Sequence, residues 1–135
     1  MAIKGFTLIE FMIVVAIIAI LVVIAIPFLQ TYLIRARVSE GLELVAPAKL
    51  AVTETAINTN VLPASQAQTG YVSPAATSYV NSIIIDPGGV ITITYTATAG
   101  GGTIIFMPTL QGNGDMTWDC SGGTLSDQYR PVNCR

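Results

Sequence analysis

Hydrophobic residues form one uninterrupted stretch near the start of the chain. Residues 11–29, FMIVVAIIAILVVIAIPFL, hold no charged side chain. At about 1.5 Å of rise per residue, a helix of this length spans the roughly 30 Å hydrocarbon core of a bilayer. A cleaved secretory signal usually has a shorter apolar region that follows positive charge. Here Glu10 precedes the stretch, so we expect a retained transmembrane helix over residues 6–30.

Beyond this stretch the hydrophobic positions recur at steps of three and four. Such steps predict one stripe of a helix, formed here by Ile34, Val38, Leu42, Val45, Ala48, Val52 and Ala56. We therefore expect one helix from about residue 7 to about residue 58, apolar in its first half and amphipathic in its second. Pro27 and Pro47 each remove a backbone donor and crowd the preceding turn, so they predict bends rather than ends.

The second half of the chain begins without a regular pattern. Residues 59–82 are rich in small and polar side chains and have no sustained period, which predicts a loop. Residues 90–96 then alternate as a strand does, with Ile91, Ile93 and Tyr95 on one face and mostly threonine on the other.

Two turn signals divide the following residues into further strands. Glycines at 100–102 lead into TIIFMPTL, in which Pro108 suggests a strand edge or end. Asn113-Gly114 is a hairpin signal that leads into DMTWDC. We therefore expect an α+β fold in which the amphipathic half of the helix covers a meander of three or four antiparallel strands over residues 83–120. Within a head domain of residues 31–135, the tail after this sheet is predicted to be a loop.

Composition and charge narrow the classes of function. The chain of 135 residues is 52% hydrophobic and only 10% charged, which suits a membrane segment attached to one small polar body. Six basic and eight acidic residues give a net charge of −2, with no basic cluster to attract nucleic acid. Histidine, the usual general base near neutral pH, is absent. We expect no enzymatic activity, no cofactor and no metal site.

The two cysteines lie close together near the C-terminus. Cys120 and Cys134 follow an export-like segment, which favours a disulfide in an oxidising compartment over a metal site, because a metal needs more ligands. Two free thiols are the alternative. On the chain-entropy model, a disulfide that closes a loop of this size contributes roughly 3 kcal/mol.

The string GFTLIEFMIVVAIIAILVVIAIP closely resembles the N-terminus of type IV pilins and of the related pseudopilins of type II secretion. The resemblance covers roughly residues 5–50 and includes Pro27, Tyr32 and Arg35. At the other end, the residues from WDC to NCR resemble the disulfide-bounded loop of major type IV pilins. In this chain the loop is residues 120–134. The resemblance implies the type IV pilin fold and a major pilin subunit.

Processing and assembly follow from the same resemblance. It implies that a prepilin peptidase removes leader residues 1–5 by cutting between Gly5 and Phe6, and methylates the new amino group of Phe6. It further implies that Glu10 pairs with the terminal amine of a neighbouring subunit in a helical filament. Charged groups that are costly alone in apolar surroundings offset each other there. A purely topological role for Glu10, in the headgroup zone, is the alternative.

The resemblance also implies a location and partners. The subunit would wait in the bacterial inner membrane, meet the pilus assembly machinery and end in an extracellular fimbrium for adhesion, twitching motility, DNA uptake or phage attachment. Host-surface receptors, DNA and phage are the corresponding outside partners. The basic residues that flank the helix are Lys4 on one side and Arg35 and Arg37 on the other, so the positive-inside rule does not place the N-terminus in the cytoplasm. The expected orientation of the helix therefore rests on the resemblance.

Three other functions remain open. A type II secretion pseudopilin shares residues 5–30, but major pseudopilins typically carry a calcium-binding loop, and Asp115, Asp119 and Asp127 are scattered. A minor pilin is a second alternative. The third is an anchored extracytoplasmic binding domain that never polymerises.

Overall fold

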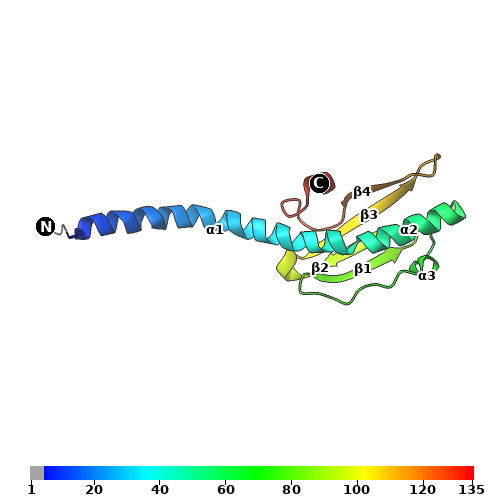
Figure 1. The fold of residues 1–135 in the computed structure, drawn as a ribbon, viewed down its shortest axis with the longest axis horizontal. Helices are drawn as coiled ribbons and strands as arrows, with labels where there is room; N and C mark the ends of the chain where they lie inside the picture. Colours follow the sequence, from blue (N-terminus) through cyan, green and yellow to red (C-terminus); the bar gives the residue numbers. More distant parts are fainter. Residues whose placement is uncertain (1–4) are drawn as a thin grey trace.

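The protein consists of one long helix that leads into a small α+β head (Figure 1). The computed structural model describes residues 5–135, so most of the expected leader, Lys4 included, lies outside the described residues. The N-terminal half of the long helix projects away from the head, and its C-terminal half lies along the sheet (Figure 1). The predicted α+β architecture, a long helix packed on an antiparallel sheet, is confirmed.

The long helix has two parts, α1 at Leu8–Leu44 and α2 at Ala46–Thr59. Only Val45 separates them, and its conformation is still right-handed helical, with φ −77° and ψ −16°. Backbone hydrogen bonds of 3.0 Å run across the junction, from the Val45 N–H to the Gly41 carbonyl and from the Lys49 N–H to the Val45 carbonyl. The expected continuous helix is therefore present with one local interruption.

The two prolines occupy different places in this helix. Pro27 lies inside α1, whereas Pro47 lies in the first turn of α2. Proline is tolerated in a first turn because its missing N–H would have no intrahelical partner there. Inside α1, by contrast, the carbonyl of Val23 loses its helical donor. The expected bends at both prolines stay predictions.

Four strands form one antiparallel meander in the order β1-β2-β3-β4. Each strand pairs with the next along the chain, as expected of strands joined by short turns. Their bounds are Val80–Asp86 for β1, Val90–Tyr95 for β2, Gly102–Leu110 for β3 and Met116–Gly122 for β4. A short 3-10 turn, η1 at Ala97–Ala99, connects β2 to β3.

The core lies between the inner face of this sheet and the amphipathic half of the helix. The predicted alternation in β2 is confirmed, because Ile91, Ile93 and Tyr95 are buried and the threonines between them are not. The predicted helix stripe is confirmed as well: its buried members are Val38, Val45, Ala48, Val52 and Ala56, and Ile34 and Leu42 pack against the core from its edge. Burial of these side chains supplies the main stabilising term.

The predicted loop over residues 59–82 is wrong in two details. It contains a one-turn helix, α3 at Gln66–Thr69, and β1 already begins at Val80. A single turn is too short to produce a helical period in the sequence. The start of β1 is hidden because Asn81 and Ser82 are polar and the register shifts between Val80 and Ser82.

The end of the chain also holds more regular structure than expected. The last strand continues to Gly122, two residues beyond the predicted end of the sheet, and the tail ends in a 3-10 turn, η2 at Val132–Cys134. The strand continues because Ile105 of β3 still pairs with Gly122. The expected Cys120–Cys134 disulfide is confirmed, and it joins β4 to η2.

Candidate functional site

The apolar half of α1 is the largest exposed hydrophobic surface among the described residues. None of its most apolar 18-residue window is buried, and the helix beginning at Leu8 is long and apolar enough to cross a membrane. Contiguous exposed apolar patches of this size are rare on monomeric soluble proteins and mark surfaces that lipid or other chains cover. The exposed residues include Ile9, Phe11, Met12, Ile13, Ile17, Ile18, Ile20, Leu21, Val23, Ile24, Phe28 and Leu29.

A capping box fixes the start of this helix. Thr7 is the N-cap, and its hydroxyl accepts a hydrogen bond of 3.3 Å from the Glu10 N–H. Glu10 Oε2 in turn accepts from the Thr7 N–H at 2.9 Å and from its hydroxyl at 2.7 Å. The T-x-x-E spacing of TLIE is the sequence signal for this motif. The prediction named Glu10 without Thr7, the residue that orients its carboxylate.

The predicted cleavage bond lies just outside the helix. Gly5 and Phe6 precede the cap, both are exposed, and the Phe6 side chain is 73% accessible. An exposed, non-helical segment is the conformation that proteases cut most readily. The structure thus brings Gly5, Phe6 and Glu10 together at one end of the molecule, while Pro47 and the cysteines lie in the head.

Two arginines of α1 form hydrogen bonds to backbone carbonyls of the head. Arg35 Nε donates to the Gln128 carbonyl at 2.5 Å, and Arg37 donates to the Thr98 carbonyl at 2.7 Å. The Arg37 guanidinium also lies 5.5 Å from the centre of the Tyr79 ring. Both cations therefore brace loops of their own chain, a role that local sequence could not reveal because the partners are 61 and 93 residues away.

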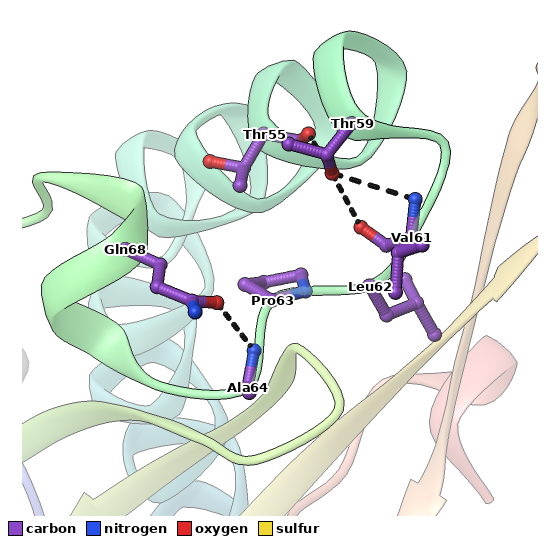
Figure 2. Close-up of a pocket in the computed structure, with 7 residues that line it drawn as sticks. All are labelled: Thr55, Thr59, Val61, Leu62, Pro63, Ala64 and Gln68. Atoms are coloured by element: carbon purple, nitrogen blue, oxygen red, sulfur yellow. Dashed lines mark hydrogen bonds between the residues drawn. The ribbon is translucent and has the colours of Figure 1, made fainter.

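A groove opens at the far end of the head, between the end of α2 and the segment after it (Figure 2). It contains no ionisable side chain, and its polar groups already pair with one another: the Thr59 hydroxyl donates to the Val61 carbonyl, and Gln68 Oε1 accepts from the Ala64 N–H. General acid–base chemistry needs a positioned titratable group. The polar groups that line the groove therefore stabilise the turn after α2 and do not form a catalytic site.

The three aspartates near the C-terminus do not converge. Asp115 accepts from the Asn113 side chain, and Asp127 lies 3.6 Å from Arg130 Nε. Asp119 accepts from the Ser121 N–H at 2.7 Å, which holds the pKa of that carboxyl below its usual value. Within residues 5–135, no group of three or more His, Cys, Asp or Glu residues is arranged to hold a metal ion.

Comparisons with known proteins find a matching family for each part of the chain. The family described as a prokaryotic N-terminal methylation motif matches residues 1–26. The family described as pilin, a bacterial filament protein, matches residues 34–135.

Similar proteins cover nearly the whole chain. The fimbrial protein EcpC of Eikenella corrodens is 39% identical, over 98% of this chain and 90% of that protein. The type IV major pilin protein PilE1 of Neisseria gonorrhoeae is 36% identical, over 87% of this chain and 68% of that protein. The prepilin peptidase-dependent protein D of Escherichia coli (strain K12) is 33% identical, over 97% and 90%.

Proposed function

This chain belongs to the pilin family as a type IV pilin, and we propose that it is the major structural subunit of a type IV pilus. The observation that carries the proposal is the exposed apolar half of α1. It suits two successive environments, the inner membrane before assembly and the packed helices of a filament afterwards. In both, a helix satisfies its own backbone hydrogen bonds, apart from the Val23 carbonyl that faces Pro27, so most of the segment needs no polar partner.

Maturation begins at the exposed Gly5–Phe6 bond. A prepilin peptidase removes residues 1–5 and methylates the amino group of Phe6, leaving residues 6–30 as the membrane and filament-core helix and residues 31–135 as the head. The match of residues 1–26 to the N-terminal methylation motif supports this step. Gly5 has no Cβ, and nothing lies within 4 Å of the place where one would stand, so the bond is open to a protease.

Glu10 then directs polymerisation by pairing with the Phe6 amine of a neighbouring subunit. The capping box supports this role because it engages Oε2 of the carboxylate through Thr7, while Oε1 accepts no hydrogen bond within residues 5–135. An unpaired charge in an apolar filament core is costly, and pairing removes most of that cost. The pair therefore favours one axial register between subunits.

Pro27 marks the part of α1 that can extend when the filament is stretched. The Val23 carbonyl has no helical donor beside it, so the surrounding turns hold together with fewer backbone bonds than the rest of α1. We expect the helix to lose order near residue 27 in the assembled fibre. A filament reconstruction with an unbroken helix from residue 19 to residue 29 would contradict this.

The subunit is a building unit and not an enzyme in this proposal. The pilus assembly machinery exports and polymerises it, and the resulting fimbrium serves adhesion, twitching motility, DNA uptake or phage attachment. Receptors, DNA or phage then meet the exposed surface of the heads. The family membership and the full-length similarity to a fimbrial protein support this reading.

Intact-mass analysis of fibres sheared from the cell surface tests the proposal. We expect a chain that begins at N-methylated Phe6 and is lighter by two hydrogens for the Cys120–Cys134 bond. A chain beginning at Met1 and found only in membranes would contradict the proposal and favour an anchored domain. Fibres confined to the periplasm would favour a pseudopilin, and a trace component of fibres built from another chain would favour a minor pilin.

A matched pair of variants tests the role of Glu10. Glu10→Gln removes the charge, and Glu43→Gln removes an exposed carboxylate from the same helix. We expect the first to lower the yield of sheared fibres by about tenfold or more, with cleavage intact, because a partner in a desolvated pair is lost. The second should leave the yield unchanged. Equal yields from both would remove Glu10 from assembly.

A further inference from the structure

Arg130 is the one charged side chain that the head buries. Its residue is 3% exposed, deep within the loop that the disulfide closes. The guanidinium donates four hydrogen bonds to backbone carbonyls, those of Leu125 at 2.7 Å, Ser121 at 2.7 Å, Gly122 at 3.0 Å and Cys134 at 3.4 Å. A planar guanidinium with five N–H donors is suited to such convergent binding, and a lysine ammonium is not.

These hydrogen bonds join the same two ends of the loop that the disulfide joins. The covalent bond joins Cys120 to Cys134 across 14 residues. The guanidinium joins the carbonyls of Ser121 and Gly122, immediately after the first cysteine, to the carbonyl of Cys134 itself. The loop is therefore closed twice, once by a bond that needs oxidation and once by a side chain that does not.

The non-covalent closure consists of charge-assisted hydrogen bonds, whose formation needs no oxidation. Arginine remains protonated in proteins. Its acidic neighbour Asp127 lies 3.6 Å away but is 79% exposed, so the buried charge depends mainly on the carbonyls. Because a buried charge without such partners is expensive, the loop backbone must stay wrapped around it.

A second set of contacts attaches the loop to the sheet. The Leu125 N–H donates to the Thr103 carbonyl at 2.9 Å, and the backbone N–H groups of Thr103 and Thr124 each donate to the other's hydroxyl at 3.1 Å. These bonds hold one side of the loop on β3 and involve neither cysteine. The hydrogen bond from Arg130 to the Cys134 carbonyl holds the C-terminal side of the loop close to the side that contacts β3.

We propose that Arg130 is a positioning residue for disulfide formation: in the reduced chain it holds Cys120 and Cys134 together, so that the loop folds first and is oxidised afterwards. Fixing two thiols side by side raises their effective concentration, and by linkage each closure favours the other. The oxidant is the disulfide of a thiol–disulfide oxidoreductase in the oxidising compartment, for which oxidised glutathione substitutes in vitro.

The chemistry is an ordinary two-step exchange. One cysteine thiolate attacks the glutathione disulfide, the S–S bond breaks, and one glutathione thiol leaves with a mixed disulfide remaining on the chain. The second thiolate attacks the chain sulfur, forms the Cys120–Cys134 bond and expels the second glutathione. The chain loses two electrons and two protons, which reduce one oxidised glutathione to two thiols.

The test measures the equilibrium between the full chain, in detergent micelles, and a glutathione redox buffer. We expect Arg130→Met to lower the effective concentration of the two thiols by about ten- to a hundredfold, since hydrogen bonds from a charged donor are lost. Tenfold corresponds to about 30 mV for this two-electron couple. Arg135→Met removes an exposed arginine whose side chain donates to the Arg130 carbonyl and leaves the Arg130 guanidinium in place, so it should change this concentration less than twofold. Equal values for both variants would overturn the proposal.

A second measurement separates positioning from a general loss of folding. In a Cys120→Ser/Cys134→Ser chain with Arg130 intact, the Leu125 and Tyr129 amides, which donate to the Thr103 and Ser126 carbonyls, should keep their protection from hydrogen exchange. Adding Arg130→Met should abolish that protection. Loss of protection on serine substitution alone would mean that the disulfide, and not Arg130, folds the loop, and would refute the proposal.

Discussion

The phenol ring of Tyr95 lies against Gly41, where it occupies the space that a Cβ atom would need. An ideal Cβ on Gly41 would stand 2.5 Å from the Tyr95 hydroxyl oxygen and 2.7 Å from two ring carbons. The hydroxyl donates a buried hydrogen bond of 3.0 Å to the Val38 carbonyl of α1. Helix and sheet are thus in close contact at a residue without a side chain.

Gly41→Ala should therefore destabilise the head, although alanine is the better helix former. Helix propensity favours alanine by about 1 kcal/mol, but overpacking a filled site costs about 1–3 kcal/mol. Tyr95 is only 2% exposed and held by its hydrogen bond, so its ring has nowhere to move. Urea unfolding, followed by the fluorescence of Trp118, measures the difference.

Glu43→Ala is the matched control for this substitution. Glu43 is exposed on the same helix, so alanine there tests propensity without the clash. We expect this control to leave stability nearly unchanged. A Gly41→Ala chain at least as stable as the wild type would mean that the helix and sheet are not in tight contact.

Tyr95 also predicts how stability changes in alkaline solution. Burial raises its pKa well above the ordinary value of about 10 for tyrosine. The unfolded chain then releases this proton at a pH where the folded chain keeps it, so stability is complete below about pH 10 and falls as the pH rises further. Urea unfolding at pH 8–11 should show a steeper fall for the wild type than for Tyr95→Phe. Parallel curves would contradict the prediction.

Local patterns were enough to predict the elements that face one core. The stripe through Val38, Val45 and Val52 and the alternation of Ile91 and Ile93 each reflect a single periodicity, and the structure buries these positions. The apolar helix and the disulfide followed from equally local signals. Periodicity carries this information because one face of each element must leave water.

Contacts between distant residues were not predictable in the same way. Nothing in the sequence around Gly41 indicates a ring that lies 54 positions further along the chain. No local pattern marks Arg130 as buried, since a buried arginine has the same local appearance as an exposed one. Its role depends on backbone carbonyls that only the closed loop brings together.

The side chain of Gln66 protects the free edge of the sheet, and its loss should be costly. Gln66 Oε1 accepts from the Ile85 N–H at 2.9 Å on the outer side of β1, and its amide nitrogen donates to the Ser73 hydroxyl at 3.2 Å. Ile85 is buried, so Gln66→Ala leaves its N–H without a partner at a cost of about 1–3 kcal/mol. Urea unfolding and hydrogen exchange at the Ile85 amide measure the loss.

Gln68→Ala is a close control for that variant. Gln68 lies on the same short helix, and its side chain also accepts one backbone hydrogen bond, from the Ala64 N–H at 2.8 Å, but in an exposed position (Figure 2). Water can replace that bond, so we expect a change below about 0.5 kcal/mol. Equal losses from both variants would mean that the edge of β1 gains nothing from Gln66.

Lys49 packs its ammonium group on aromatic rings of the sheet. Its nitrogen lies 3.9 Å from the centre of the Phe106 ring and 5.5 Å from that of Trp118. Partial burial lowers the pKa of this lysine, which means that the charged form loses hydration on folding. Attraction between the cation and the ring faces offsets part of that loss.

A double-mutant cycle measures this attraction. Lys49→Met keeps most of the apolar contact and removes the charge, and Phe106→Leu keeps a hydrophobic side chain and removes the ring. We expect the free energies of unfolding of the four chains to give a coupling of about 0.5–1 kcal/mol in favour of the wild-type pair. The same cycle with Glu54→Gln in place of Lys49→Met, an exposed charge on the same helix, should give no coupling. A coupling near zero for Lys49 as well would mean that its ammonium group is held there by the packing of its stem and not by the rings.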